Sequence, residues 1–429
     1  MLPEDVSNLL ASAQACVQAH DYHGAVALYK DALARLDPQT AVPDLKENRL
    51  YVLRECGRLL GILGDQETAL ALHQQYQQEA GATRHGLIGL IYIGQHLRGL
   101  GRYQDALHAY EKALALAEQL QDADGQARSL MGIGSTYLVQ GATEQALDCF
   151  TEAYEHFAAS GNIQGQVQMA NLTGVAQATG GQVEKAIRAF QNGLKMARQL
   201  RLHEREAVLL NNLGECYQLL FASEQALACH QEGLALVETA RLRLVEADLC
   251  RNIGIDLCYL GRVDEGLEYL QRALSISQTT GNVDIEQYTL AALSFTQFMR
   301  GHSSMALAYA EQLRETAVPH NARHHLATAL YIIGLIQQKQ GNSDDATETW
   351  QQAQFLAHET NSRMLLWRIH TAQAAIAQTQ GLADVHWRIA REIIQQISDS
   401  LQDHTLRATF LAAPEIRTIL TATDGTLSP

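Results

Sequence analysis

The histidines of this sequence are its most obvious candidates for chemistry, but they do not complete a recognisable site. His320, His324 and His325 cluster in the segment HNARHH. His320 and His324 lie one helical turn apart, a spacing that suits two metal-ligating imidazoles, but a third ligand is not evident. The sequence also has no phosphate-binding loop, no Gly-x-Ser-x-Gly elbow and no His-Glu-x-x-His pair. We therefore expect neither catalysis nor a bound metal or other cofactor.

A second set of polar and aromatic residues recurs at a fixed spacing, and this pattern favours the binding of another molecule. Asn171, Asn211 and Arg251 follow one another at intervals of 40 residues, and Tyr331 lies two intervals further on. The positions around Asn211 and Arg251 are polar, whereas those around Tyr331 are apolar and aromatic. An asparagine carboxamide can both donate to and accept from a peptide backbone. Aromatic side chains supply much of the binding energy in a pocket.

These residues belong to a repeat that extends through most of the chain. Eight units at an unbroken period of 40 share a small residue at one position: Gly94, Gly134, Gly174, Gly214, Gly254, Ser294, Gly334 and Ala374. Most units add a second glycine seven residues later, although Phe221 takes that place in one unit. A fixed period in this range is the signature of a stacked array of helix pairs. The first small residue lets two helices approach closely, and the second glycine ends the first helix.

The recurring pattern resembles the tetratricopeptide repeat family. The resemblance is carried by spaced small and aromatic residues, as in Gly134, Tyr137, Gly141, Ala146, Phe150 and Ala153. The 40-residue form, with lengthened helices, is similar to that of kinesin light chain, the Leu-Gly-Asn polarity adaptors and bacterial signalling regulators. The resemblance implies an all-α fold, a right-handed α-solenoid of about ten stacked antiparallel helix pairs with a C-terminal capping helix.

We expect five consecutive segments in the chain. Residues 1–43 form an outlying first helix pair with a spacer, and residues 44–82 form a second, irregular pair. Residues 83–400 form the regular array of eight units. Residues 401–422 break the period and are predicted to form one or two amphipathic helices that cap the last unit, whose hydrophobic face would otherwise be exposed. Residues 423–429 are predicted to form a disordered tail.

In tetratricopeptide repeat proteins the first helices of the pairs line a concave face, which is the usual binding surface. The resemblance therefore implies which positions meet a partner. The predicted partner-binding residues are Arg128, Asn171, Asn211, Asn212, Glu215, Asp248, Arg251, Asn252, Tyr288, Phe295, Phe298 and Tyr331. For Phe295 and Phe298 a second interpretation stays open, in which they fill space between neighbouring helices where Ser294 replaces glycine.

The sequence predicts a non-catalytic scaffold or adaptor that binds a peptide or helix of another protein on its concave face. The alternative is a regulatory domain that senses a peptide or metabolite and acts on a separate effector. The formal net charge of −15 argues against general nucleic-acid binding and against an anionic membrane surface. Residues 1–20 lack the basic start and apolar core of a signal peptide, so a cytoplasmic protein is expected. The oligomeric state is left open.

Overall fold

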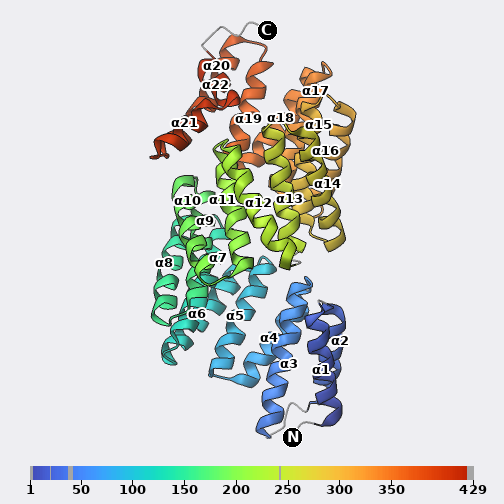
Figure 1. Cartoon of the computed structure of the whole chain (residues 1–429), viewed down its shortest axis with the longest axis vertical. Coiled ribbons are helices and arrows are strands. Elements are labelled where there is room, and N and C mark those ends of the chain that lie inside the picture. Colours follow the sequence, from blue (N-terminus) through green and yellow to red (C-terminus); the bar gives the residue numbers. More distant parts are fainter. Residues whose placement is uncertain (1–2, 20, 37–41, 241–242, 423–429) are drawn as a thin grey trace. The chain divides into compact units, whose positions relative to one another are not determined.

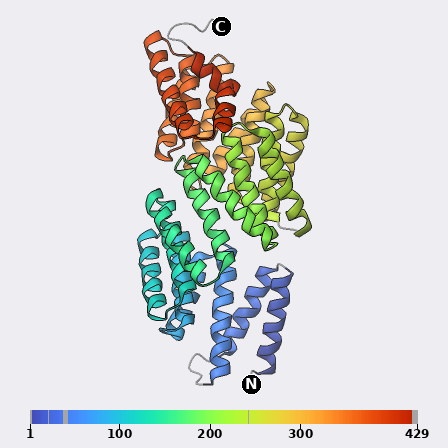
Figure 2. The same ribbon diagram turned by 60° about the vertical axis from the view of Figure 1, so that its left-hand side comes forward.

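The computed structural model describes residues 3–19, 21–36, 42–240 and 243–422. These residues form 22 α-helices and no strand, and consecutive helices pack as pairs (Figures 1 and 2). The prediction of an all-α solenoid is therefore confirmed. The predicted disordered tail lies outside the described residues. Among the helices that the structure describes, none has the length and apolar character needed to span a bilayer.

The chain divides into two compact units, Met1–Ala176 and Gln177–Pro429. The helices of the N-terminal unit are α1 (Glu4–Gln18), α2 (Tyr22–Arg35), α3 (Pro43–Ile62), α4 (Gln66–Ala80), α5 (Arg84–Gly99), α6 (Tyr103–Gln119), α7 (Ala123–Val139) and α8 (Thr143–Ala159), with most of α9 (Ile163–Thr179).

The C-terminal unit continues the same alternation of first and second helices. Its helices are α10 (Val183–Gln199), α11 (His203–Leu219), α12 (Ser223–Ala240), α13 (Arg243–Tyr259), α14 (Val263–Thr280), α15 (Val283–Met299), α16 (Ser303–Ala317), α17 (Arg323–Lys339), α18 (Ser343–Glu359), α19 (Arg363–Ala375), α20 (Gln380–Asp399), α21 (His404–Ala412) and α22 (Pro414–Thr421).

Small residues of the repeat lie where the two helices of a pair touch. A Cβ atom added at Gly134 would lie 2.7 Å from the ring of Phe150, and one added at Gly94 would lie 2.7 Å from the ring of Tyr110. Ala146, on the second helix of its pair, is fully buried. Interiors are close-packed, so a larger residue at these glycines would displace the aromatic ring. The close approach predicted from the sequence is therefore present.

Most of the described turns inside a pair use a left-handed backbone conformation, whereas Gly381, the last glycine of this register, lies within α20 and does not. Gly141 has φ +78° and Gly261 has φ +79°. Phe221 takes the same place in the turn between α11 and α12, with φ +57°. A residue with a Cβ atom pays roughly 1–2 kcal/mol for this conformation, whereas glycine does not. This one turn therefore keeps an aromatic side chain at a cost in backbone energy.

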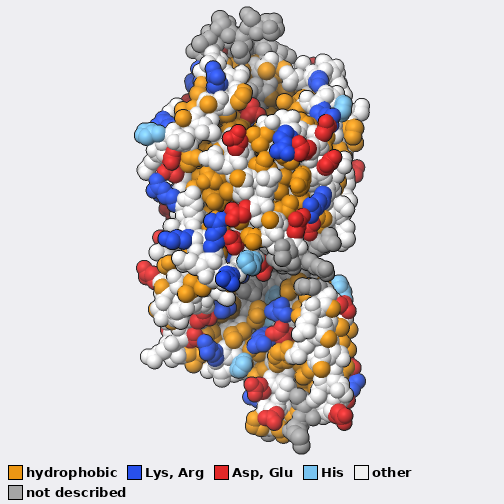
Figure 3. All heavy atoms as spheres, viewed as in Figure 1, with side chains coloured by type: hydrophobic (Ala, Val, Ile, Leu, Met, Phe, Trp, Pro, Cys, Tyr) orange, Lys and Arg blue, Asp and Glu red, His pale blue; other side chains and the backbone are white. Residues whose placement is uncertain are grey.

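Charged and hydrophobic side chains share the surface of the C-terminal unit. Figure 3 shows hydrophobic side chains gathered on the visible face of this unit, with acidic and basic side chains among them. The net charge of −15 is therefore not concentrated in one acidic area on this face. All seven cysteines of the chain have free thiols.

Candidate functional site

First helices of the C-terminal unit line a pocket of about 410 Å³. Its lining residues come from α11, α13, α15 and α19: Glu215, Gln218, Leu219, Asp248, Arg251, Ile255, Tyr259, Asp284, Ile285, Tyr288, Met364 and Arg368. Four repeat periods separate Gly214 of α11 from Ala374 of α19. The C-terminal unit therefore curves enough to bring first helices of distant repeats around one space.

Arg251 is the cation of this pocket with the most polar partners. One of its guanidinium nitrogens lies 2.9 Å from Glu215 Oε1 and 2.5 Å from Asp248 Oδ1. The guanidinium carbon lies 5.0 Å from the centroid of the Tyr288 ring. Burial disfavours the charged guanidinium, but Asp248 and Glu215 outweigh this effect and raise the pKa of Arg251 above its ordinary value. Arg251 thus stays charged and fixes side chains from three helices in place.

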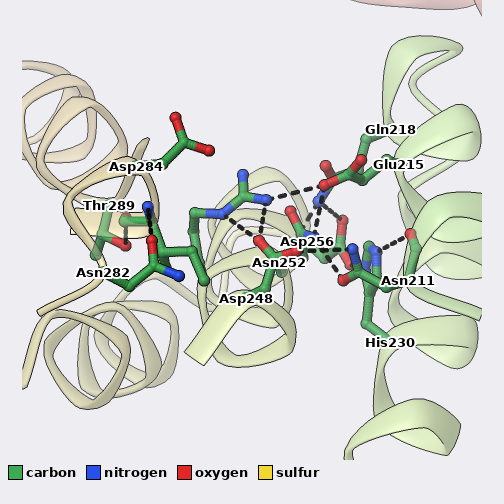
Figure 4. Close-up of polar contacts among 12 residues, drawn as sticks. Asn211, Glu215, Gln218, His230, Asp248, Asn252, Asp256, Asn282, Asp284 and Thr289 are labelled. Atoms are coloured by element: carbon green, nitrogen blue, oxygen red, sulfur yellow. Dashed lines mark hydrogen bonds and ion pairs between the residues drawn. The ribbon is translucent and has the colours of Figure 1, made fainter. Parts of the chain in front are cut away.

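A hydrogen-bond network lies behind this wall of the pocket (Figure 4). Asn252 Nδ2 donates to Asn211 Oδ1 at 2.9 Å and to Glu215 Oε1 at 3.1 Å. Asn211 Nδ2 donates to Asp248 Oδ2 at 3.0 Å. Asn211 is 4% exposed and Asn252 is 0% exposed. The two asparagines therefore position Glu215 and Asp248. Neither asparagine side chain is accessible to a partner.

The network ends in a buried histidine–carboxylate pair. His230 Nδ1 lies 2.7 Å from Asp256 Oδ2, and both side chains are completely buried. The other ring nitrogen of His230 lies 3.2 Å from the backbone carbonyl oxygen of Asn211 and donates to it. Gln218 Nε2 donates to Asp256 Oδ1 at 2.8 Å, which links the pair to a residue of the pocket wall. Four other units carry an aromatic residue where this one has His230: Tyr110, Phe150, Phe190 and Trp350.

Arg368 of α19 is the second cation of the pocket, and its environment differs from that of Arg251. Its guanidinium carbon lies 5.0 Å from the Trp367 ring centroid, and Nη2 lies 3.4 Å from the Tyr259 hydroxyl. Among the residues that the structure describes, no carboxylate forms an ion pair with Arg368. Its guanidinium N–H donors are therefore not taken up by an ion pair with a described residue.

The histidine cluster does not form a metal site in the described part of the chain, where no group of three or more candidate ligands comes together. His325 Nε2 instead lies 3.2 Å from Asp284 Oδ1, and this hydrogen bond lowers the pKa of Asp284. The ring of His325 also packs edge-on against Tyr288, with centroids 4.3 Å apart. His325 therefore supports two residues that line the pocket.

A larger groove of about 950 Å³ lies between α16, α17 and α18. Val318, Leu330 and Phe355 contribute to its lining, and Phe355 is 64% exposed. Charged side chains are present at this groove, but they do not form a connected network like the one around Arg251. We favour the smaller pocket as the candidate site because its polar groups converge from separate helices.

Family models describe the repeats directly. Two models of the tetratricopeptide repeat match this chain, one at residues 87–159 and the other at residues 247–280. The chain therefore contains tetratricopeptide repeats in both of these stretches. The second match covers most of α13 and α14, so this part of the tetratricopeptide repeat array carries Arg251 and Asp256. Among curated proteins, no relative matches the chain.

Several solved structures have a similar fold. A Rap protein complexed with competence and sporulation factor is 14% identical, with 84% of this chain and 99% of that chain covered and a TM-score of 0.58. The apo form of the quorum sensor NprR from B. thuringiensis is 14% identical, with coverage of 82% and 99% and a TM-score of 0.56. The Rap conjugation gene regulator of plasmid pLS20, in complex with the Phr* peptide, is 14% identical, with coverage of 84% and 98% and a TM-score of 0.55. At this identity the similarity establishes the fold.

The predicted partner-binding residues fall into separate environments. Four of them line the pocket: Glu215, Asp248, Arg251 and Tyr288. Asn211 and Asn252 lie behind it, as described above. Asn212 is half-buried on α11 and is not a lining residue. Arg128 and Asn171 belong to the N-terminal unit, where Arg128 pairs with Asp124 at 2.6 Å.

The three aromatic residues expected near Tyr288 lie against the hydrophobic core. Phe295 and Phe298 are half-buried and pack on a core cluster that contains Trp350, and Tyr331 is itself a member of that cluster. The indole nitrogen of Trp350 donates to the backbone oxygen of Tyr331 at 3.0 Å. None of the three lines the pocket. These contacts favour the packing interpretation for Phe295 and Phe298.

Proposed function

We propose that the C-terminal unit binds a short peptide, or an extended segment of a partner protein, in the pocket between α11, α13, α15 and α19. The observation that carries this proposal is that charges of both signs converge there with an exposed aromatic ring. The pocket volume of about 410 Å³ lies within the usual range for ligand sites. The protein then acts by binding and not by catalysis, as a scaffold or regulator of another protein.

Each part of the pocket suits a different part of a peptide. Glu215 and Asp284 offer carboxylate oxygens to backbone N–H groups or to a basic side chain. Arg368 offers guanidinium donors to a backbone carbonyl or a carboxylate. Tyr288, which is 38% exposed, offers a flat surface to an apolar side chain. An extended peptide carries all of these groups, which makes it a better match than a purely apolar ligand.

Similar structures provide independent support. The Rap conjugation gene regulator was solved with the Phr* peptide, and another Rap protein was solved with competence and sporulation factor. Both share the helical fold over more than four fifths of the present chain, at 84% coverage each. A small metabolite would also fit the pocket by volume, and the following experiment distinguishes the two ligand classes.

The test is retention of a defined pool of short synthetic peptides by the full chain, with retained members identified by mass spectrometry. We expect Tyr288→Ala to lower the affinity for retained peptides about tenfold or more, because truncating a central aromatic contact removes a large part of the binding energy. Tyr154→Ala is the matched control, since Tyr154 lies on the second helix α8 and has the same 38% exposure. It should leave retention unchanged.

Failure of the peptide proposal would take a specific form. If Tyr288→Ala and Tyr154→Ala retain the same peptides with the same affinity as the parent, the pocket is not the peptide site. If no peptide is retained but a metabolite pool raises the midpoint of thermal unfolding of the parent, and Tyr288→Ala removes that shift, the ligand is a small molecule and the peptide proposal is wrong.

A further inference from the structure

Two backbone N–H groups just before α21 are bound by a side chain from far away in the sequence. Gln402 and Asp403 donate their backbone N–H groups to Glu184 Oε2 at 2.5 and 2.9 Å, across 218 and 219 residues. Glu184 lies in the first turn of α10, where it also pairs with Arg188. Its side chain is only 8% exposed. A buried carboxylate that receives two backbone N–H groups at a helix start is a strong and directional contact.

An aromatic contact holds the other end of α21. Phe410 is completely buried, and its ring centroid lies 6.1 Å from that of Phe221. Phe221 is the residue that replaces glycine in the turn between α11 and α12. Figure 1 shows α21 extending from the C-terminal helices toward α10. Both ends of this short helix are therefore attached to repeats that lie well before it in the chain.

The same aromatic residue connects α21 with the candidate site. The ring of Phe221 also meets Tyr259 edge-on, with centroids 6.2 Å apart. Tyr259 lines the pocket, and its hydroxyl is the hydrogen-bond partner of Arg368. A continuous series of contacts therefore leads from α21 through Phe221 and Tyr259 to the pocket.

These contacts exceed what a terminal cap requires. A cap needs only to cover the exposed side of the last pair, and α20 already contacts α21 and α22. Glu144 and Glu224 occupy the position of Glu184 in α8 and α12, and both are exposed. A glycine at position 221 would form the turn without backbone strain. The buried carboxylate and the strained aromatic residue occur together where α21 docks, which indicates a site built for this helix.

We propose that α21 is a releasable latch that docks on Glu184 and Phe221, closes the C-terminal unit around the pocket and is coupled to the pocket through Tyr259. With nine residues, α21 is too short to be a stable helix by itself, so release also melts it. Such a segment opens independently of the rest of the fold. The latch does not depend on which ligand the pocket binds.

The test is hydrogen–deuterium exchange of the full chain, followed by mass spectrometry. In Glu184→Gln and in Phe221→Gly we expect the amides of residues 402–412 to exchange about tenfold faster or more. Glu184→Gln replaces the charged acceptor of two backbone N–H groups with a neutral one, and Phe221→Gly removes the ring that meets Phe410. Exchange in α20 should stay as in the parent. Glu224→Gln is the matched control, since it alters the same helix position where the carboxylate is exposed. It should leave residues 402–412 unchanged.

The coupling to the pocket is tested in the same way. Tyr259→Ala removes the ring that meets Phe221 edge-on, and it should also speed exchange of residues 402–412. Unchanged exchange of this segment in both Glu184→Gln and Phe221→Gly would overturn the latch. If amide exchange in α20 accelerates as much as in residues 402–412, α21 is only part of a terminal cap, and this result also overturns the latch. Unchanged exchange in Tyr259→Ala would remove the proposed coupling.

Discussion

Replacing His230 with phenylalanine is expected to lower the free energy of unfolding by about 3–5 kcal/mol. Two other units of the repeat carry phenylalanine at this position, Phe150 and Phe190, so sequence similarity alone would predict little effect. The loss arises because Asp256 is completely buried. In the variant, Asp256 would keep its hydrogen bond from Gln218 but would lose its contact with the imidazole of His230. A buried carboxylate that has lost one of its hydrogen-bond partners is strongly destabilising. Chemical denaturation of the full chain, followed by circular dichroism, measures the change.

The double variant His230→Phe/Asp256→Ala separates this explanation from a packing defect. Three other units carry alanine or isoleucine at the position of Asp256: Ala176, Ile336 and Ile376. Replacing a buried ion pair with apolar residues is often close to neutral, so the double variant should recover most of the lost stability. A double variant as unstable as the sum of the two single variants would contradict the ion-pair explanation.

Mild acid is expected to destabilise the N-terminal unit through two buried histidines. His73 Nδ1 lies 2.8 Å from His96 Nε2. Burial, followed by the neighbouring His96, lowers the pKa of His73 from 6.5 to about 3, and burial lowers the pKa of His96 to about 4. Below pH 6.5 the unfolded chain therefore binds protons that the folded chain does not, so stability is complete above this pH and falls as the pH decreases. At pH 5 the loss is on the order of 2 kcal/mol for each histidine.

The variant His73→Tyr tests this pH dependence. Tyrosine occupies the equivalent position at Tyr29 and Tyr110, so it should be accommodated by the helix pair. We expect the loss of stability between pH 7 and pH 5 to fall by roughly half, because one of two titrating histidines is gone. Amide exchange in α4 and α5 measures this loss of stability within the N-terminal unit. His108→Gln, at a side chain that is 67% exposed, is the control. An unchanged pH dependence in His73→Tyr would contradict the assignment.

The helix pairs could be predicted from the sequence because each pair is specified locally. Gly134, Gly141, Ala146 and Phe150 each perform a packing or turn function within one repeat, and the period of 40 residues repeats these functions along the chain. The structure shows the expected close contact between Gly134 and Phe150 and the expected left-handed turn at Gly141.

The pocket could be predicted only in part. The repeat register places Glu215, Asp248, Arg251 and Tyr288 on one face, and the structure has all four lining one pocket. The register does not report how deeply the next helix covers a side chain. Register alone therefore does not show that Asn211 and Asn252 are buried, or that Tyr331 lies in the core. Arg368 shares the register of Asp248 and Tyr288, so the repeat pattern carries a signal for it that the sequence analysis did not use. That Arg368 and Glu215 line one pocket depends on curvature accumulated over four repeats, which the register does not report.

The contacts of α21 show a similar limit. The buried positions Leu406, Phe410, Ile416 and Ile419 follow from the amphipathic pattern of residues 401–422. The pattern does not reveal that Phe410 meets Phe221 or that the segment binds Glu184, since both contacts join parts of the chain far apart in sequence. Phe221 carries the one local signal, as an aromatic residue at a position that otherwise holds glycine.

The most direct test of the peptide-binding proposal is the amide-exchange footprint of a retained peptide on the full chain. The proposal predicts that a saturating peptide slows exchange in α11, α13, α15 and α19, the four helices that line the pocket. It also predicts that Tyr288→Ala abolishes this protection at the same peptide concentration. Protection confined to α16 and α18, beside the larger groove, or to helices of the N-terminal unit would contradict it.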